Sequence, residues 1–365
     1  MRKLISAACI CLSVFSLVAC GSKNNKTDNS SANKESGYEL ALITDAGSID
    51  DKSFNQGSWE GLEKFAKDNN LSKKYYKPAD KSTEALKSAI DLAVKGGAKT
   101  IVCSGFLFEV PVYDVQKTYS DTKFILVDGA PHDEGYTDFT INDNVVGVTF
   151  AEHEAGFLAG YAAVKDGYKK LGFMGGMAAQ SVMRFGYGFV QGADYAAKEL
   201  GLTDVEVKYN YTGTFDASPE IQSAAAAWYS QGTEVIFACG GSIGNSIMAA
   251  ADAAGKKVIG VDVDQSNESQ SVITSAMKQL STAVYDQLQS IYDGKFAGGK
   301  TLVLSAKDNA VGLPMDSSKF STFTKDDYNA VFDQLVKGEI KLQTDSDADD
   351  VSKLTLSNVK VEEIK

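Results

Sequence analysis

Short apolar runs alternate along the chain with longer amphipathic stretches in which apolar residues recur at helical spacing. This order is typical of βαβ units on a parallel sheet, whose strands are buried on both faces. The pattern predicts strands at 40–43, 99–103, 123–127, 170–174, 205–209, 234–239, 257–261, 272–277 and 301–305. It predicts helices at 57–69, 84–95, 112–119, 150–165, 188–200, 219–231, 243–254 and 280–292.

These elements form two successive α/β series, and many of the predicted strands end in glycine or aspartate. The chain has 365 residues, more than a single hydrophobic core usually supports. We therefore predict two similar lobes with a cleft between them. The strand at 272–277 and the helix at 280–292 are additional to the elements of the second series, and we expect them to pack on the first lobe.

The N-terminus has the pattern of an export signal. Arg2 and Lys3 precede an apolar run, 4–19, that is short for a membrane span. The run ends in Leu-Val-Ala-Cys, which resembles the bacterial lipobox, so we predict a signal peptide over 1–19 and a diacylglycerol on Cys20. Residues 20–37 are predicted to be a flexible tether, which makes the protein extracytoplasmic and membrane-anchored. The alternative is an uncleaved signal anchor.

The charge balance excludes some partners. The chain carries 48 acidic and 36 basic residues, a formal net charge of −12, and has no basic block. This argues against nucleic acid and against electrostatic binding to a membrane surface. With two histidines in the whole chain, a Ser-His-Asp relay or a histidine-rich zinc site is not expected. Cys103 and Cys239 each end a strand-like run and are predicted to be separate buried thiols.

Two motifs resemble known sites but lack their context. Residues 294–301 match the phosphate-loop pattern, but a helix is predicted before them and a strand after them, the reverse of what phosphate binding needs. The aspartates at 262–264 and 345–349 resemble calcium-loop fragments without the required glycine and glutamate. We therefore predict no metal and no cofactor.

Ligand-type residues cluster at the predicted strand ends. Asp45 follows the first strand, and Phe54 and Asn55 begin a helix shortly after it. In open α/β sheets this edge is where ligands bind, although turn capping and core filling would also explain these residues. Asp262 and Lys278 end neighbouring strands, and a carboxylate with an ammonium suits a polyhydroxyl group.

Two glycine-rich segments add to this edge. The amides of 240–242 precede a helix, and Phe185 lies in a segment rich in glycine and aromatic residues. An aromatic side chain there can stack on a planar ring, while ordinary packing between helices is the alternative for Phe185.

Taken together, these residues resemble the basic membrane protein family of bacterial substrate-binding lipoproteins, in its purine nucleoside receptor branch. The resemblance rests on Thr44-Asp45 with the run Asp-Asp-Lys-Ser-Phe-Asn-Gln at 50–56, and on Glu-Ala-Gly-Phe-Leu-Ala-Gly at 154–160. It is also carried by Gly-Val-Asp-Val-Asp-Gln at 260–265 and Thr-Ser-Ala-Met-Lys at 274–278.

The resemblance implies a periplasmic-binding-protein-like α/β fold of the type with three inter-lobe crossings, in which two parallel-sheet lobes enclose a ligand cleft. The first lobe is expected over 38–145 with 278–304, and the second over 146–277 with 305–365.

The family's ligand-binding positions match Asp45, Phe54, Asn55, Asp128, Phe185, Gly240, Asp262 and Lys278. The resemblance implies that the two phenylalanines hold the base and that Asp45 and Asn55 bind its edge. The other two aspartates and the lysine are implied to bind the ribose, with help from an amide near Gly240.

The hypothesis is an extracytoplasmic receptor of an ABC importer that binds nucleosides such as guanosine, adenosine or inosine and passes them to a permease and ATPase on other chains. No catalytic residue is predicted. A sugar or polyol receptor of the same fold is one alternative. A nucleoside-processing enzyme and a sensor that activates a partner are two others.

Overall fold

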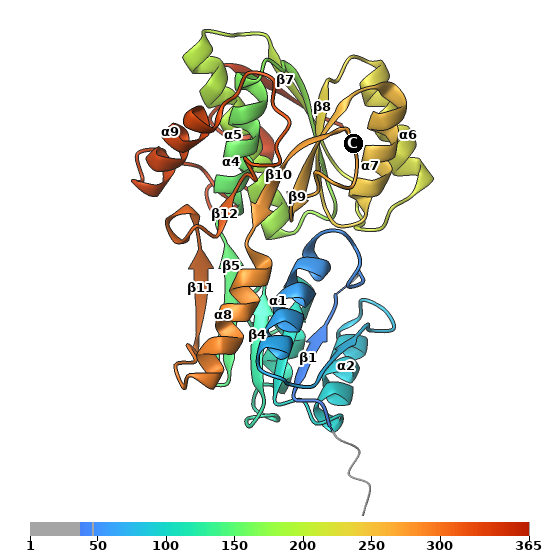
Figure 1. Cartoon of the computed structure of the whole chain (residues 1–365), viewed down its shortest axis with the longest axis vertical. Helices are drawn as coiled ribbons and strands as arrows, with labels where there is room; N and C mark the ends of the chain where they lie inside the picture. Colours follow the sequence, from blue (N-terminus) through green and yellow to red (C-terminus); the bar gives the residue numbers. More distant parts are fainter. Residues whose placement is uncertain (1–36, 46, 365) are drawn as a thin grey trace, which may run out of the picture. The chain divides into compact units, whose positions relative to one another are not determined.

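The computed structural model describes residues 37–45 and 47–364, in which strands and helices alternate (Figure 1). The predicted signal peptide, Cys20 and all but the last residue of the predicted tether lie outside the described residues. Among the residues described, no helix is both long and apolar enough to cross a membrane. The predicted α/β class with parallel sheets is confirmed.

The first sheet is parallel throughout. Within the described residues it has six strands in the order β11-β5-β4-β3-β1-β2. They are β1 (Leu40–Ile43), β2 (Lys73–Tyr76), β3 (Thr100–Ser104), β4 (Lys123–Val127), β5 (Val145–Phe150) and β11 (Lys300–Leu304). β1 and β3 are buried along their whole length because helices cover both faces, which explains why they read as continuous apolar runs.

The second sheet repeats this plan with one antiparallel edge. In the described part of the chain its order is β12-β10-β9-β8-β6-β7-β13, and only β12 is antiparallel to its neighbour. Its strands are β6 (Lys170–Gly175), β7 (Val205–Tyr211), β8 (Val235–Cys239), β9 (Lys257–Asp262), β10 (Val272–Lys278), β12 (Val311–Gly312) and β13 (Val359–Glu363). In Figure 1 this sheet lies above the first.

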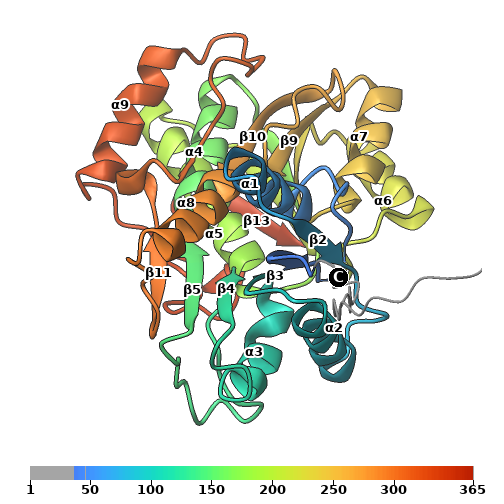
Figure 2. The ribbon, with the colours of Figure 1, turned by 60° about the horizontal axis from the view of Figure 1, so that its bottom comes forward.

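Helices cover both faces of each sheet (Figures 1 and 2). The α-helices are α1 (Phe54–Asp68), α2 (Thr83–Lys95), α3 (Glu109–Val115), α4 (Glu152–Lys165), α5 (Gln180–Leu200), α6 (Pro219–Ser230), α7 (Ile243–Ala254), α8 (Leu280–Tyr292) and α9 (Lys325–Val336). Three short 3₁₀ helices are η1 (Phe106–Phe108), η2 (Ala306–Asp308) and η3 (Val351–Lys353). The pairs α1 with α8, α2 with α3, α4 with α5 and α6 with α7 pack together.

The chain passes between the sheets three times within the described residues. It leaves the first sheet after β5 and enters α4, which packs against β10 of the second sheet. It returns after β10 into α8, which packs on α1, and leaves again after β11 for β12. The predicted lobe boundaries stay a prediction, but because β5 belongs to the first sheet, we propose that the first crossover lies near Ala151 and not at residue 145.

Several element boundaries differ from those expected. β5 was not predicted, and the helix expected from residue 150 begins at Glu152. α5 begins at Gln180, before the expected residue 188. The glycine-rich segment around Phe185 therefore belongs to the helix, which packs closely on α4. The order of elements suggested that β10 packs on the first lobe, whereas the resemblance implied the second. β10 pairs with β9 in the second sheet, while the following helix does pack on the first.

Glycines allow α4 and α5 to pack with their backbones in contact. A Cβ atom on Gly156 or Gly160 would lie 2.1 Å or 2.0 Å from the carbonyl oxygen of Phe185 or Phe189. Gly188 makes the same kind of approach to α4, where a Cβ would lie 2.0 Å from the carbonyl oxygen of His153. This contact explains the Glu-Ala-Gly-Phe-Leu-Ala-Gly motif and fixes the position of Phe185 relative to the start of α4.

The substitution Gly160→Ala should separate the two helices, because the new methyl group would overlap the backbone of Phe189. We expect a loss of about 1–3 kcal/mol in the free energy of unfolding, measured by urea titration with circular dichroism. The matched control is Gly244→Ala in α7, where the nearest atom, Cε of Met248, lies 3.7 Å from the added Cβ. Because alanine favours a helix, the control should not lose stability. Equal losses in both variants would contradict this packing.

Candidate functional site

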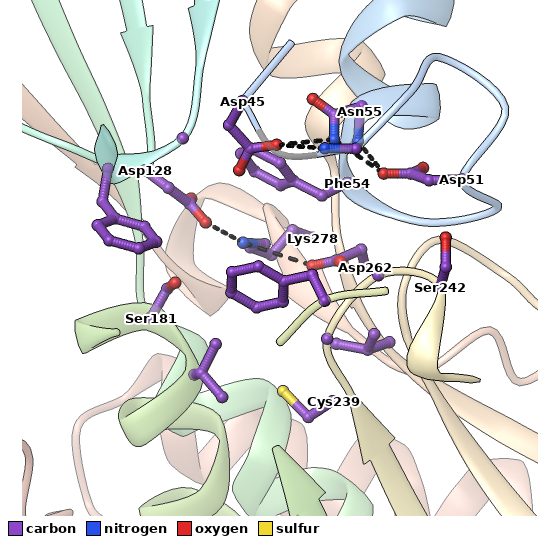
Figure 3. Close-up of a pocket in the computed structure, with 18 of the residues that line it drawn as sticks. Asp45, Asp51, Phe54, Asn55, Asp128, Ser181, Cys239, Ser242, Asp262 and Lys278 are labelled. Carbon is purple, nitrogen blue, oxygen red and sulfur yellow. Dashed lines mark hydrogen bonds and ion pairs between the residues drawn. The ribbon is translucent and has the colours of Figure 1, made fainter. Parts of the chain in front are cut away.

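A cavity lies where the carboxyl ends of strands from both sheets meet (Figure 3). All eight residues predicted to bind a ligand line it: Asp45, Phe54, Asn55, Asp128, Phe185, Gly240, Asp262 and Lys278. Its empty volume is about 600 Å³ including its opening, yet the centre of a water-sized sphere can move through only about 60 Å³ of it. Little of the cavity is therefore wide enough for a water-sized sphere to move, so we expect the walls to move apart when a larger molecule binds.

The turn after β1 holds one side-chain amide in a fixed orientation. Asp51 accepts hydrogen bonds from the backbone N–H groups of Ser53, Asn55 and Gln56 at 2.9–3.1 Å, and so caps α1. The Asn55 amide nitrogen donates to Asp45 at 3.0 Å and to Asp51 at 2.9 Å. Both donors are therefore used, and the buried Asn55 oxygen has no hydrogen-bond partner among the described residues. This oxygen can therefore accept a hydrogen bond from an N–H or O–H group of a ligand.

Two phenylalanines from opposite sides of the cavity flank one ammonium group. Phe54 begins α1 beside the first sheet, and Phe185 lies in α5 beside the second. Lys278 Nζ is 4.8 Å from the centre of the Phe54 ring and 5.5 Å from that of Phe185. Phe185 also packs edge-to-face on Phe237, with ring centres 5.9 Å apart, so it serves both the core and the cavity.

Lys278 is buried among carboxylates. Its Nζ lies 2.5 Å from Asp128, 3.4 Å from Asp262 and 4.0 Å from Glu152, and only 2% of its side-chain surface is exposed. Asp262 also accepts a hydrogen bond of 2.5 Å from the Ser53 hydroxyl. Because an unpaired buried charge is costly, the ammonium and its carboxylates stabilise one another only as a group.

Burial shifts the pKa values within this cluster. Burial and the neighbouring Asp128 carboxylate raise the pKa of Glu152 to about 7. Burial also raises the pKa of Asp128, although Lys278 opposes it. Burial alone would lower the pKa of Lys278, but Asp128, Asp262 and Glu152 outweigh it and hold the pKa above its usual value. At neutral pH the ammonium is therefore charged.

Both aspartates of this cluster have a left-handed backbone conformation. Asp128 follows β4 with φ = 59°, and Asp262 ends β9 with φ = 66°. Such a conformation strains a residue other than glycine, though aspartate tolerates it better than most. Strain of this kind is typical of functional sites, and here it occurs where each strand end reaches the cavity.

The glycines at the ends of β6 and β8 lie close to each other and to Phe215. A Cβ atom on Gly240 would lie 2.8 Å from the backbone nitrogen of Gly176, and one on Gly176 would lie 2.4 Å from the ring of Phe215. Gly240 lines the cavity and Gly176 does not. The glycine-rich turn after β6 therefore admits Phe215 and the neighbouring backbone rather than a ligand.

Sequence reasoning missed several residues of the cavity wall. Asp51 was noted only as part of a motif, Cys239 only as a buried thiol and Ser242 only for its backbone amide, and nothing in the sequence marked three others that line it: Phe106, Ser181 and Phe215. Glu152 and Arg184 were also missed, because buried charge clusters form only when distant segments meet.

The remaining motifs have ordinary structural roles. Residues 294–301 join the end of α8 to β11, which confirms the helix-loop-strand order predicted for them. Asp345 pairs with Arg184 at 2.7 Å. Cys103 and Cys239 are both buried and free, and burial raises the pKa of each thiol. Among residues 37–45 and 47–364, no group of three or more His, Cys, Asp or Glu side chains could hold a metal ion.

Comparison with known proteins adds to this geometry. Residues 38–346 match the family model of Bmp, described as "ABC transporter substrate-binding protein PnrA-like". The chain belongs to the Bmp family. It is an ABC transporter substrate-binding protein, a class that works outside the cytoplasm.

Individual relatives agree with this assignment. "ABC transporter nucleoside-binding protein BmpA" of Lactococcus lactis subsp. cremoris is 30% identical over 338 residues, which cover 87% of this chain and 92% of the relative. Basic membrane protein D of Borreliella burgdorferi is 28% identical over 326 residues, 88% of each chain. A solved ABC transporter solute-binding protein of Aeropyrum pernix K1 has a TM-score of 0.75 at 24% identity, over 86% of this chain and 95% of that one. This confirms the predicted periplasmic-binding-protein fold.

Lys278→Met should leave the carboxylates of Asp128, Asp262 and Glu152 buried without their shared ammonium. We expect a loss of about 3–5 kcal/mol in the free energy of unfolding at pH 8. Burial already raises the folded-state pKa of Asp128 and of Glu152, and without the opposing ammonium both rise further above their unfolded values. The loss should therefore be smaller at pH 5, where they bind protons, and grow as the pH rises through those pKa values.

Urea unfolding at both pH values measures this effect. Lys325→Met is the control, because it breaks an exposed ion pair with Asp316 and should change stability little at either pH. A loss for Lys278→Met that is the same at pH 5 and pH 8 would contradict the proposed charge cluster.

Proposed function

We propose that this chain is the receptor of an ABC importer that binds nucleosides, purine nucleosides in particular, between two closing lobes and does not alter them chemically. The observation that carries the proposal is the composition of one cavity: an aromatic ring from each side, an amide oxygen with no partner in the described part of the chain, and a buried group of carboxylates with one ammonium.

The first end of the cavity suits a nucleobase. Phe54 and Phe185 offer two ring faces between which a planar base can stack. The Asn55 oxygen accepts from an N–H group, which guanosine, adenosine and inosine all carry on the edge of the base. Asp45 holds the Asn55 amide in this orientation, so the acceptor is ready before the ligand arrives.

The other end suits a sugar that carries vicinal hydroxyls. Asp128 and Asp262 accept from hydroxyl groups, and Lys278 donates to them. One Asp128 oxygen is buried and makes no hydrogen bond within the described residues, which leaves an acceptor for the ligand. A site built in this way rejects analogues without hydroxyls, because its buried polar groups would stay unpaired.

Transport also needs a membrane and partner chains. We propose that Cys20 carries the lipid anchor and that residues 1–19 are removed, as the lipobox-like sequence indicates. A permease and an ATPase on other chains would receive the ligand when the two lobes open. The small free volume of the cavity supports such a cycle, because a nucleoside can enter only when the walls move apart.

The rival functions use the same residues differently. A sugar receptor would also use aromatic rings, carboxylates and the Asn55 acceptor, but the nucleoside-binding name of the Lactococcus relative favours a nucleoside. A nucleoside hydrolase that binds calcium through an aspartate cluster at the first strand end is disfavoured, because Asp51 is occupied in capping α1. Free ribose released from inosine by the protein would favour the enzyme.

The test is calorimetric titration of the domain from residue 37 onward, unfolded and refolded to remove any ligand that co-purifies. The ligands are guanosine, adenosine, inosine, cytidine, ribose, glucose and the free bases. We expect binding of nucleosides without binding of ribose or glucose. Sugar binding alone would replace the nucleoside proposal by the sugar receptor, and no binding at all would favour the sensor.

Phe54→Ala should weaken nucleoside binding by about 1–3 kcal/mol, roughly 5- to 150-fold in Kd, because the base loses one stacking partner. The matched control is Phe139→Ala, which removes an exposed ring outside the cavity and should leave Kd unchanged. Equal nucleoside affinities of wild type and Phe54→Ala would show that the base does not stack on Phe54.

A further inference from the structure

A second cavity adjoins the first and shares Phe106, Asp128 and Ser181 with it. Its empty volume is about 910 Å³ including its opening, larger than the 600 Å³ of the first by the same measure. The loop after β4, the start of α4 and the start of α5 form its walls. Since Asp128 faces both spaces, a ligand held at Asp128 can extend from the first cavity into the second.

Glu152 is the unusual residue of this second cavity. It is fully buried, and neither of its carboxylate oxygens makes a hydrogen bond within the described residues. The nearest cations are Arg184, with Nη1 at 3.5 Å, and Lys278, with Nζ at 4.0 Å. A buried carboxylate with unused acceptor positions is costly to maintain, which indicates that it has a partner absent from the chain itself.

The charges around this cavity favour hydrogen-bond donors over anions. Glu109, Asp128 and Glu152 line it, and Arg184 is the single basic residue among its described lining residues. The Arg184 guanidinium is already paired with Asp345 at 2.7 Å, and Glu109 contacts His132 at 3.3 Å. A phosphate in this space would meet three acidic side chains, and the ionised ones would repel it.

The direction of a bound sugar follows from the positions of the two aspartates. Asp262 lines only the first cavity, whereas Asp128 lies at the boundary with the second. A ribose whose vicinal hydroxyls bind Asp262 and Lys278 can direct its 5′ carbon past Asp128, which borders both cavities. The 5′ substituent of a nucleoside would therefore enter the second cavity.

We propose that the second cavity is the subsite for the 5′ substituent and that Glu152 is its specificity residue, selecting hydroxyl or amino groups and rejecting 5′-phosphates. This inference rests on the proposed function, because it assumes a nucleoside in the first cavity. It defines the ligand class more narrowly: nucleosides with a neutral or cationic donor at the 5′ position, and not nucleotides.

The experiment compares 5′ derivatives of whichever of guanosine, adenosine and inosine binds most tightly to the refolded domain. Calorimetry at neutral pH gives Kd for the parent, the 5′-deoxy, the 5′-amino-5′-deoxy and the 5′-monophosphate forms. In wild type we expect the 5′-amino form to bind about tenfold or more tightly than the 5′-deoxy form. The monophosphate should bind about a hundredfold or more weakly than the parent.

In the variant Glu152→Gln the affinity for the 5′-amino form relative to that for the 5′-deoxy form should fall by about tenfold, because the amino group loses a charged acceptor. The same substitution should also improve monophosphate binding about tenfold. The matched control is Glu154→Gln on the same helix, whose side chain accepts from the backbone N–H of Ala306 and lines neither cavity. Its ligand ratios should equal those of wild type.

Each outcome decides between the two proposals. A monophosphate that binds as well as the parent, or no preference of wild type for the 5′-amino form, overturns the role of the second cavity while the nucleoside proposal stands. Unchanged ratios in folded Glu152→Gln overturn the role of Glu152. Failure of wild type to bind any parent nucleoside overturns both proposals. The wild-type series needs no variant, so it decides even if Glu152→Gln does not fold.

Discussion

One buried ammonium holds the junction of the two sheets together. Lys278 ends β10 of the second sheet, while Asp128 follows β4 of the first, and their side chains meet at 2.5 Å. Asp262 and Glu152 complete the group. Because an isolated charge cannot be buried without a partner, this arrangement requires both sheets to bring their strand ends to the same place. The position of the cavity follows from that requirement.

The same cluster explains how a site can be both stable and ready for a ligand. Without a ligand, Lys278 satisfies the carboxylates and lies near the faces of both phenylalanine rings. A sugar that arrives with several hydroxyls can take over part of this role, since hydroxyls donate to the carboxylates and accept from the ammonium. The acceptors left without partners in the described residues, on Asn55, Asp128 and Glu152, mark where the ligand would have to donate.

Much of this arrangement could be predicted from the sequence. The apolar runs gave β1 and β4 with their observed bounds, because strands buried on both faces must be apolar throughout. The predicted site residues come together around one cavity because they lie at strand ends or at a helix start beside them, which a parallel sheet places at one edge. Whether they bind a nucleoside stays a prediction.

Other features depend on contacts that no local pattern reveals. The first part of α5 is rich in glycine and was not predicted to be helical. In the structure Gly188 and Gly192 allow the backbones of α5 and α4 to approach closely, a contact between separate helices that no local pattern shows. Nothing in the sequence singles out Glu152, and only the folded chain shows that it is buried beside Lys278 and Arg184. Asp51 was noted only as part of a motif, whereas in the structure it orients Asn55.

The most direct test of the central claim is a crystal structure of the domain from residue 37 onward, grown with the nucleoside that binds most tightly. Our account predicts the base between Phe54 and Phe185, with an N–H group on the Asn55 oxygen and the ribose hydroxyls at Asp262 and Lys278. A nucleoside bound elsewhere, or one whose base lies away from both rings, would contradict the account.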